Sequence, residues 1–139
     1  MESRTARSIM RSLDVCLEPD WTLDKVSDHL TKHQVPGAPV VDEQGNAVGF
    51  VSEYDCLQQL MQANYYCDNT AMAKDVMSKE LHSIAPDLQL MDVASAINQS
   101  KLNVIAVMEE GQLLGLITRG DTMRALVENL DVCAIPQAS

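Results

Sequence analysis

Aromatic residues and positive charge are both scarce in this sequence of 139 residues. It contains one Trp, one Phe and three Tyr, so the core must be aliphatic, with the eight Met as adaptable filler. The formal net charge of −10 disfavours non-specific binding to nucleic acid and attachment to anionic membranes, because both depend on Lys and Arg. A small anionic ligand stays possible, since its site needs positive potential only locally.

Long apolar runs and paired cysteines are also absent. No run approaches the roughly 20 residues of a membrane span, and the start, MESRTARSIMRSLD, lacks the apolar stretch of a secretory signal. The four cysteines form no Cys-x-x-Cys pair, which disfavours a zinc site. We expect free thiols in a reducing cytoplasm, with Cys67 and Cys133 exposed and Cys16 and Cys56 slow to react.

The sequence contains an internal repeat. The stretch GFVSEYD (49–55) returns as GLITRGD (115–121), an offset of 66. Farther upstream, IMRSLDVCLEPDWTL (9–23) matches VMSKELHSIAPDLQL (76–90) at an offset of 67. One residue is therefore lost between the two matches, and we place this loss between Val35 and Val40.

Each repeat predicts the same order of elements: a short strand, an amphipathic helix, two strands joined by a tight turn, and a last helix. Apolar residues at i, i+3 and i+7 predict one buried stripe on the first helix. This helix is expected to end near Lys32 in the first repeat and Lys101 in the second. Gly45 and Gly111 are available for a positive φ in the turns, and the last helix is expected to begin at the Asp of the motif.

These elements predict the fold class α/β (α+β), with two β-α-β-β-α repeats packed in pseudo-two-fold symmetry as one globular module. A single repeat would leave one apolar face and one strand edge uncovered, and two repeats packed face to face cover both. The predicted boundaries are 8–62 for the first repeat, 63–72 for a linker, 73–130 for the second repeat and 131–139 for a tail.

The repeated motif, Gly-apolar-x-hydroxyl-x-x-Asp, has two interpretations that can both hold. Ser52 with Asp55, and Thr118 with Asp121, fit a capping box at the start of a helix. The same place suits a nucleotide, because unpaired N–H groups and the helix dipole attract phosphate. An ionised Asp accepts hydrogen bonds only, so it can hold the two O–H donors of a ribose. The first glycine of the motif is expected to leave room beside the strand.

The repeat resembles the CBS domain, and the doublet resembles a CBS pair, or Bateman module. The resemblance rests on HQVPGAPVVDEQGNAVGFVSEYD (33–55), on GLITRGDTMRAL (115–126) and on the repeated Met…Pro-Asp segments before them. It covers about residues 9–127. In this family the motif holds the ribose and phosphates of adenosine nucleotides such as AMP, ADP, ATP or S-adenosylmethionine, so the resemblance implies such a ligand.

The resemblance also implies roles for particular residues. It places the hydroxyl on Ser52 and Thr118, and the ribose carboxylate on Asp55 and Asp121. The implied contacts with adenine come from the first strand and from the residues before and in the second strand: Cys16, Gly37, Ala38 and Pro39 in the first repeat, and Ser83, Asn103, Val104 and Ile105 in the second. The second set departs from the family's Gly-x-Pro pattern, and its bulkier side chains could narrow a pocket.

Charge differs between the two motifs. Arg119 follows Thr118 and can fork onto a phosphate, whereas Glu53 follows Ser52 and would repel one. We therefore expect phosphate to prefer the cleft near Arg119, the alternative being that this Arg is merely solvated. No His pairs with a nucleophile or an acid at a catalytic spacing, so no enzyme is predicted. Acidic residues could hold a divalent ion, but nothing in the sequence fixes a geometry, and no metal site is assigned.

The leading hypothesis is a regulatory module that senses an adenosine nucleotide and signals to a partner protein, with no cofactor beyond that ligand. The alternative is a ligand-free dimerisation or interaction scaffold in which the repeated loops are only helix caps. An enzyme ranks third. A homodimer is expected in both of the first two cases, through apolar helix surface that the small shared core leaves available: Leu57, Leu60, Met61, Met123, Leu126 and Val127.

Overall fold

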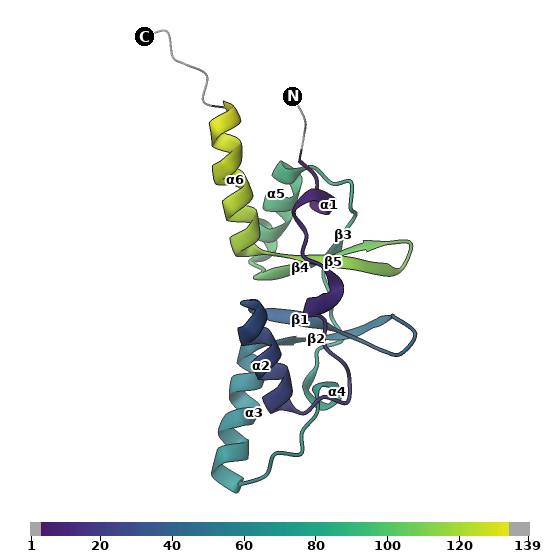
Figure 1. Cartoon of the computed structure of the whole chain (residues 1–139), viewed down its shortest axis with the longest axis vertical. Helices are drawn as coiled ribbons and strands as arrows, with labels where there is room; N and C mark the ends of the chain where they lie inside the picture. Colours follow the sequence, from purple (N-terminus) through teal and green to yellow (C-terminus); the bar gives the residue numbers. More distant parts are fainter. Residues whose placement is uncertain (1–3, 134–139) are drawn as a thin grey trace.

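Two small sheets lie face to face at the centre of the protein, and each carries its helices on its outer side (Figure 1). The computed structural model describes residues 4–133, and the side chains as far as Asp131. The first sheet pairs β1 (Gly37–Val41) with β2 (Ala47–Ser52), antiparallel. The second sheet has the order β3-β4-β5 and contains β3 (Ser83–Ile84), β4 (Val104–Glu109) and β5 (Gln112–Thr118). This arrangement confirms the predicted fold class.

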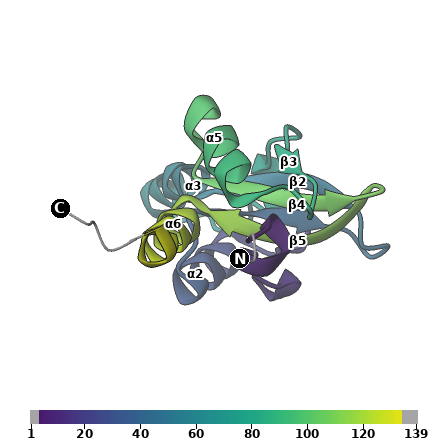
Figure 2. The same ribbon diagram turned by 90° about the horizontal axis from the view of Figure 1, so that it is seen from above.

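Four long helices cover the outer faces of the sheets. On the first sheet lie α2 (Leu23–His33) and α3 (Glu53–Tyr66), and on the second lie α5 (Leu90–Ser100) and α6 (Arg119–Cys133). The short elements are α1 (Ala6–Ile9), the 3₁₀ helix η1 (Leu13–Val15) and α4 (Ala73–Val76). Seen from above, both hairpins extend to the side opposite α3 and α6 (Figure 2).

The predicted apolar stripes explain how α2 and α5 pack. On α2 the buried side chains are Leu23, Val26 and Leu30, three and four residues apart. The corresponding residues of α5 are buried in the same way. Each helix ends in a left-handed residue, Gln34 with φ 55° and Lys101 with φ 54°, which is a usual way to end a helix. The predicted ends near Lys32 and Lys101 are therefore confirmed.

The last helices start earlier and run farther than the sequence indicates. α3 begins at Glu53 and α6 at Arg119, two residues before the Asp of each motif. The reason is that the hydroxyl residue, not the Asp, is the N-cap. The predicted linker 63–72 is also helical as far as Tyr66.

The strand pairing shows where the repeats differ in length. Gly37 pairs with Ser52 in the first hairpin, and Val104 pairs with Thr118 in the second. The offset of 67 therefore continues along β1 and β4, and the missing residue falls in the hairpin turn. The predicted loss between Val35 and Val40 is wrong. A one-residue slip inside a strand would move every following side chain to the opposite face, whereas a turn can absorb it.

The segment that leads into each repeat pairs with the sheet of the other repeat. Arg11 N donates to Leu116 O of β5 at 2.7 Å, and Leu116 N donates back to Arg11 O at 3.2 Å. Ser78 makes the equivalent pair of bonds with Phe50 of β2, at 2.8 and 2.9 Å. We call the stretches 4–12 and 71–79 the crossing segments. Because of this exchange, neither repeat can complete its sheet without the other.

The first glycine of each motif makes room for a crossing segment, not for a ligand. A Cβ at Gly49 would overlap Met77 Sδ, and one at Gly115 would overlap the carbonyl oxygen of Arg11. The expectation of space beside the strand is correct, but the other repeat fills that space. Any side chain at Gly115 has to push the backbone of the crossing segment away.

Replacing Gly115 should therefore destabilise the protein, which urea denaturation can measure. We expect Gly115→Ala to lower the free energy of unfolding by about 1–3 kcal/mol, as overpacking usually does. Gly120→Ala is the matched control, because its added methyl would meet nothing closer than Thr118 Oγ1 at 3.7 Å. In helix α6 that change should be neutral or stabilising by up to about 1 kcal/mol. Equal stability of the two variants would contradict the close crossing.

Candidate functional site: two clefts between the repeats

Both copies of the repeated motif form complete capping boxes. Asp55 N donates to Ser52 Oγ at 3.1 Å, and Ser52 N donates to Asp55 Oδ2 at 2.9 Å. In the second copy, Asp121 N donates to Thr118 Oγ1 at 2.9 Å, and Thr118 N donates to Asp121 Oδ2 at 3.2 Å. The capping interpretation is therefore confirmed for both copies. Whether a copy can also bind a ligand depends on what surrounds it, and the surroundings differ.

The first copy faces an open cleft of about 220 Å³ between the repeats. Ser52 stands in its wall, at the N-terminus of α3, where backbone N–H groups and the helix dipole favour an anion. The rest of the lining comes from both repeats: Pro36, Pro39 and Phe50 from the first, and Glu80, Leu81, His82, Lys101, Leu102, Asn103, Val104 and Ala106 from the second.

The charged groups of the open cleft are few and mixed. Lys101 brings a cation at the end of α5. His82 Nε2 lies 3.3 Å from Glu80 Oε1, so the charge of Glu80 has a partner when His82 is protonated. Asp55 is half-buried and does not itself line the cavity. Within the described part of the chain, no Lys, Arg or His forms an ion pair with Asp55.

The second copy is closed by an arginine from a crossing segment. Thr118 is 4% exposed and Asp121 is 8% exposed. Arg11 donates to both carboxylate oxygens of Asp121, from Nε to Oδ2 at 2.8 Å and from Nη2 to Oδ1 at 3.0 Å. Its Nη1 donates to the carbonyl oxygen of His33 at 2.6 Å. Arg11 thus joins the end of α2 to the start of α6.

Hydrogen bonding keeps Asp121 ionised despite its burial. Burial alone would raise the pKa of Asp121, but the hydrogen bonds with Arg11 and Thr118 outweigh that effect and lower the pKa below its usual value. The same contact with Asp121 raises the pKa of Arg11, against the opposing effect of desolvation. Both groups are charged at neutral pH, and their bidentate geometry is the strong form of this pair.

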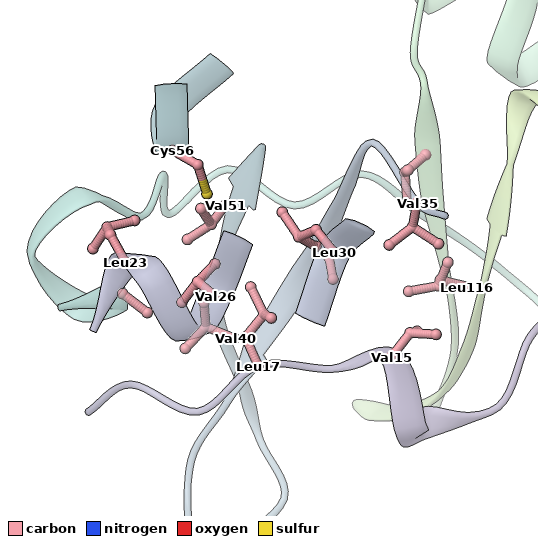
Figure 3. Close-up of a cluster of buried hydrophobic side chains, with 13 residues drawn as sticks. Val15, Leu17, Leu23, Val26, Leu30, Val35, Val40, Val51, Cys56 and Leu116 are labelled. Atoms are coloured by element: carbon pink, nitrogen blue, oxygen red, sulfur yellow. The ribbon is translucent and has the colours of Figure 1, made fainter. Parts of the chain in front are cut away.

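Behind Arg11, the second cleft is filled by Val15. This residue corresponds to His82 of the open cleft, at the offset of 67. Val15 is 3% exposed and belongs to one apolar cluster with Val35 and Leu116, which lie beside it in Figure 3. In the second cleft, the apolar side chain of Val15 therefore fills the position that corresponds to the imidazole of His82 at the edge of the first cleft.

The structure brings four of the predicted ligand residues together, since Pro39, Ser52, Asn103 and Val104 all line the open cleft. Two others are directed elsewhere, because Ala38 and Ile105 belong to the hydrophobic cores between sheet and helices. Successive residues of a strand face opposite sides, so the neighbours of Ile105, which are Val104 and Ala106, line the cleft instead.

The remaining predicted residues lie apart from the open cleft. Gly37 is buried in β1, and Ser83 is exposed on β3. Cys16 borders a different cavity. Arg119 is exposed in a groove between α5 and α6, beside Met123. The expectation that phosphate prefers a cleft near Arg119 therefore has no support in this geometry.

Eight lining residues escaped the sequence analysis: Pro36, Phe50, Glu80, Leu81, His82, Lys101, Leu102 and Ala106. The signal that would have found Ala106 was the true offset of the strands, which only the pairing reveals. Arg11 was overlooked as well, although it stands opposite Ser78 in the repeat alignment and so marks a difference between the two halves.

A larger cavity, of about 650 Å³, lies at Cys16 and Trp21. Five carboxylates border it: Asp14, Glu18, Asp20, Asp42 and Glu43. Such a rim repels phosphate, and the cavity contains no residue of the repeated motif. We therefore assign the candidate site to the smaller cleft at Ser52.

Within the described residues, no group of three or more His, Cys, Asp or Glu side chains is arranged to hold a metal ion. None of the helices described here combines the length and the apolar character needed to cross a membrane.

A family model of the CBS domain matches the chain twice, at residues 6–62 and 73–128. The two matches cover most of the chain and coincide with the two repeats around the open and the closed cleft. The protein belongs to the CBS-domain family and is a tandem CBS pair.

Known proteins share this fold along nearly the whole chain. The AcuB protein of Vibrio cholerae has a TM-score of 0.82 at 20% identity, with 95% of this chain and 96% of that chain covered. CBSX2 of Arabidopsis thaliana, solved in complex with AMP, has a TM-score of 0.75 at 25% identity, with 91% and 98% covered. MJ1225 of Methanocaldococcus jannaschii is 24% identical over 120 residues, which are 86% of this chain but only 42% of MJ1225.

The thiols should differ in reactivity as their surroundings differ. Burial, with a smaller contribution from Asp14, raises the pKa of Cys16 to about 11, so at pH 8 about one molecule in a thousand carries the reactive thiolate. Burial also raises the pKa of Cys56. Cys67 is exposed. The side chain of Cys133 lies outside the described residues, so its exposure stays a prediction.

We expect a thiol reagent at pH 8 to label Cys67 first and Cys16 and Cys56 slowly, in a Cys133→Ser background that removes the tail thiol. Time-resolved labelling followed by mass spectrometry of peptides measures each rate. Raising the pH from 8 to 9 should speed labelling of Cys16 about tenfold, because the thiolate fraction rises tenfold below its pKa. Labelling of Cys16 as fast as Cys67 at pH 8 would show that the segment following η1 is open to solvent.

Proposed function

We propose that this protein is a regulatory module that binds an adenosine nucleotide in the cleft at Ser52 and signals its presence to a partner protein. The observation that carries the proposal is the composition of that cleft, which unites a helix N-terminus, a lysine and apolar strand residues from both repeats. Support comes from CBSX2, a CBS-pair relative whose structure contains AMP.

Each part of a nucleotide has a suitable neighbour in the cleft. The apolar strand residues Pro39, Val104 and Ala106 offer a wall for the adenine ring. The carboxylate of Asp55, in the first turn of α3, is placed to accept hydrogen bonds from the ribose hydroxyls of a bound nucleotide. Phosphate fits between the N-terminus of α3 and the ammonium of Lys101.

The size and charge of the cleft favour a monophosphate. Its volume of about 220 Å³ is below the roughly 300–1,000 Å³ of ordinary ligand pockets, so it has room for the nucleoside and one phosphate and leaves any further phosphates towards solvent. Glu53 is exposed directly after Ser52, and Glu80 lines the cleft. Both carboxylates oppose additional phosphate charge, so we propose AMP before ADP or ATP. S-Adenosylmethionine, which carries no phosphate, is the remaining candidate.

A ligand in this cleft would touch both repeats, because Ser52 belongs to one and Lys101 to the other. It would therefore stabilise one relative arrangement of the repeats over others, and a partner that recognises that arrangement would sense the nucleotide. The free thiols Cys16, Cys56 and Cys67 fit a protein that works in the reducing cytoplasm.

Nucleotide binding can be tested by calorimetric titration with AMP, ADP, ATP, S-adenosylmethionine and adenosine. Asp55→Ala should lower the affinity for AMP by about ten- to a hundredfold, because a lost charge-assisted hydrogen bond costs roughly 1.5–3 kcal/mol. Lys101→Ala should lower the affinity for AMP but leave the affinity for adenosine unchanged, because the substitution removes only the phosphate contact. Lys79→Ala is the control, since this exposed lysine is not part of the lining.

The alternative function, a ligand-free scaffold, is favoured by one observation, the completeness of both capping boxes. It predicts that no adenosine compound changes the thermal stability of the wild-type protein. It also predicts that Asp55→Ala only destabilises the ligand-free protein, by about 0.5–2 kcal/mol. AMP at about 100 times its dissociation constant should instead stabilise the wild type by roughly 2.7 kcal/mol if the nucleotide binds.

We also propose that the module is a homodimer formed through α3 and α6. Large apolar side chains are exposed along both helices, among them Leu57 and Met61 on α3, and Met123 and Val127 on α6. Leu60 and Leu126, which were predicted to belong to the same surface, are half-buried. Exposed apolar side chains of this kind mark interaction sites, and a two-fold contact would use the same surface on both chains.

Light scattering at tens of micromolar should therefore give the mass of two chains. The double variant Met61→Lys with Val127→Lys should give one chain, because two desolvated ammonium groups per protomer would oppose the contact. Leu13→Lys is the control, since Leu13 is exposed but lies in η1, away from both helices. A monomeric wild type would refute the proposed assembly.

A further inference from the structure

The two clefts of this CBS pair should be equivalent by repeat symmetry, but one side chain makes them different. Arg11 pairs with Leu116 of β5, and Ser78 pairs in the same way with Phe50 of β2, so the two occupy corresponding positions. Arg11 reaches the motif carboxylate, Asp121, beside it. The Ser78 hydroxyl instead accepts a bond from Glu80 N at 3.1 Å and leaves Asp55 alone.

The carboxylate of Asp121 has no acceptor capacity left. Its Oδ2 accepts from Thr118 N at 3.2 Å and from Arg11 Nε at 2.8 Å. Its Oδ1 accepts from Arg11 Nη2 at 3.0 Å and from Arg124 Nη1 at 3.3 Å. A carboxylate offers about four lone-pair positions, and all of them are occupied. A ribose diol could bind only by displacing an arginine.

Asp55, the corresponding group of the open cleft, keeps most of its capacity. Among the described residues, the only donor on its carboxylate is Ser52 N, at 2.9 Å from Oδ2. Its Oδ1 and part of Oδ2 are available to a ligand. The motif carboxylate is therefore saturated with hydrogen bonds in the second repeat and largely free to accept them in the first.

Arg11 is also held at its other end. Its Nη1 donates to the carbonyl oxygen of His33, the last residue of α2. The negative end of a helix dipole stabilises a cation there. The guanidinium thus spans the second cleft from the first repeat to the second, while Val15 fills the space between Val35 and Leu116.

We infer that Arg11 acts as the built-in occupant of the second site, taking the place of a ribose on Asp121, so that each chain binds one nucleotide, in the cleft at Ser52. The inference rests on the proposed nucleotide binding and adds its stoichiometry and the residue that sets it. A pair whose second site is permanently filled responds to its ligand in a single step, without cooperativity between two sites of one chain.

Equilibrium dialysis with radiolabelled AMP counts the sites directly. We expect one AMP per chain in the wild type. Asp55→Asn should weaken binding at least tenfold, and Asp121→Asn, the matched variant of the second motif, should change the affinity less than twofold. Two AMP per chain in the wild type, or an equal loss in both variants, would overturn the inference.

A designed exchange tests whether Arg11 and Val15 are what closes the second cleft. The double variant Arg11→Ser with Val15→His gives the second cleft the residues found at the corresponding positions of the first, Ser78 and His82. We expect it to bind a second AMP per chain, and the additional Asp121→Asn substitution should abolish that second binding alone. A folded double variant, with an unchanged circular dichroism spectrum, that still binds one AMP would contradict the inference.

Failure of the proposed function is distinguishable from failure of this inference. If neither the wild type nor any variant binds AMP, the function fails, and the Arg11–Asp121 pair is tested without ligand. Urea denaturation of Arg11→Met, Asp121→Asn and the double variant forms a double-mutant cycle, in which we expect a coupling of about fivefold or more in the unfolding equilibrium constant. Additive effects would overturn the role of Arg11 as occupant of that carboxylate.

Discussion

The exchange of crossing segments between the repeats is the constraint on which the rest of the structure depends. Backbone pairs join Arg11 to Leu116 and Ser78 to Phe50, so each sheet gains an edge from the chain that leads into the other repeat. The crossing requires glycine at positions 49 and 115, which the motif supplies. It fixes the separation of the two sheets and therefore the width of both clefts. It also carries Arg11 to the second motif, so the same constraint that holds the repeats together makes their sites unequal.

Local patterns in the sequence were sufficient to predict the four long helices and the two hairpins. They did not predict how the elements interlock, and the short strand expected at Val15–Leu17 is wrong, because Leu13–Val15 form the 3₁₀ helix η1. The stripe Leu23, Val26 and Leu30 and the turn glycines act over a few residues, and the structure has the helices and hairpins that they predict. The crossing depends on backbone bonds between residues more than 25 positions apart, which no local periodicity encodes. The position of the missing residue was misjudged for a related reason, because a pairwise comparison of the repeats cannot detect the pairing that keeps β1 and β4 in register.

The same limit applies to the candidate site. Ser52, Pro39, Asn103 and Val104 could be predicted because a repeated motif and a family resemblance marked them. Ala38 and Ile105 were misplaced because adjacent strand residues face opposite sides. An error of one residue in the alignment therefore assigns a core side chain to the cleft. The closure of the second cleft could not be predicted at all. An arginine opposite a serine is visible in the aligned repeats, but its bidentate contact with Asp121 appears only when the crossing segment is placed in space.

One cleft between the repeats is open, and the other is closed by the chain itself. This arrangement fits a sensor with a single ligand site. The most direct test is a crystal structure of the protein grown with AMP. We expect electron density for one nucleotide per chain between Ser52 and Lys101, with Arg11 still on both oxygens of Asp121. Density for a nucleotide beside Thr118 with Arg11 displaced, or no nucleotide in either cleft at saturating AMP, would contradict this assignment.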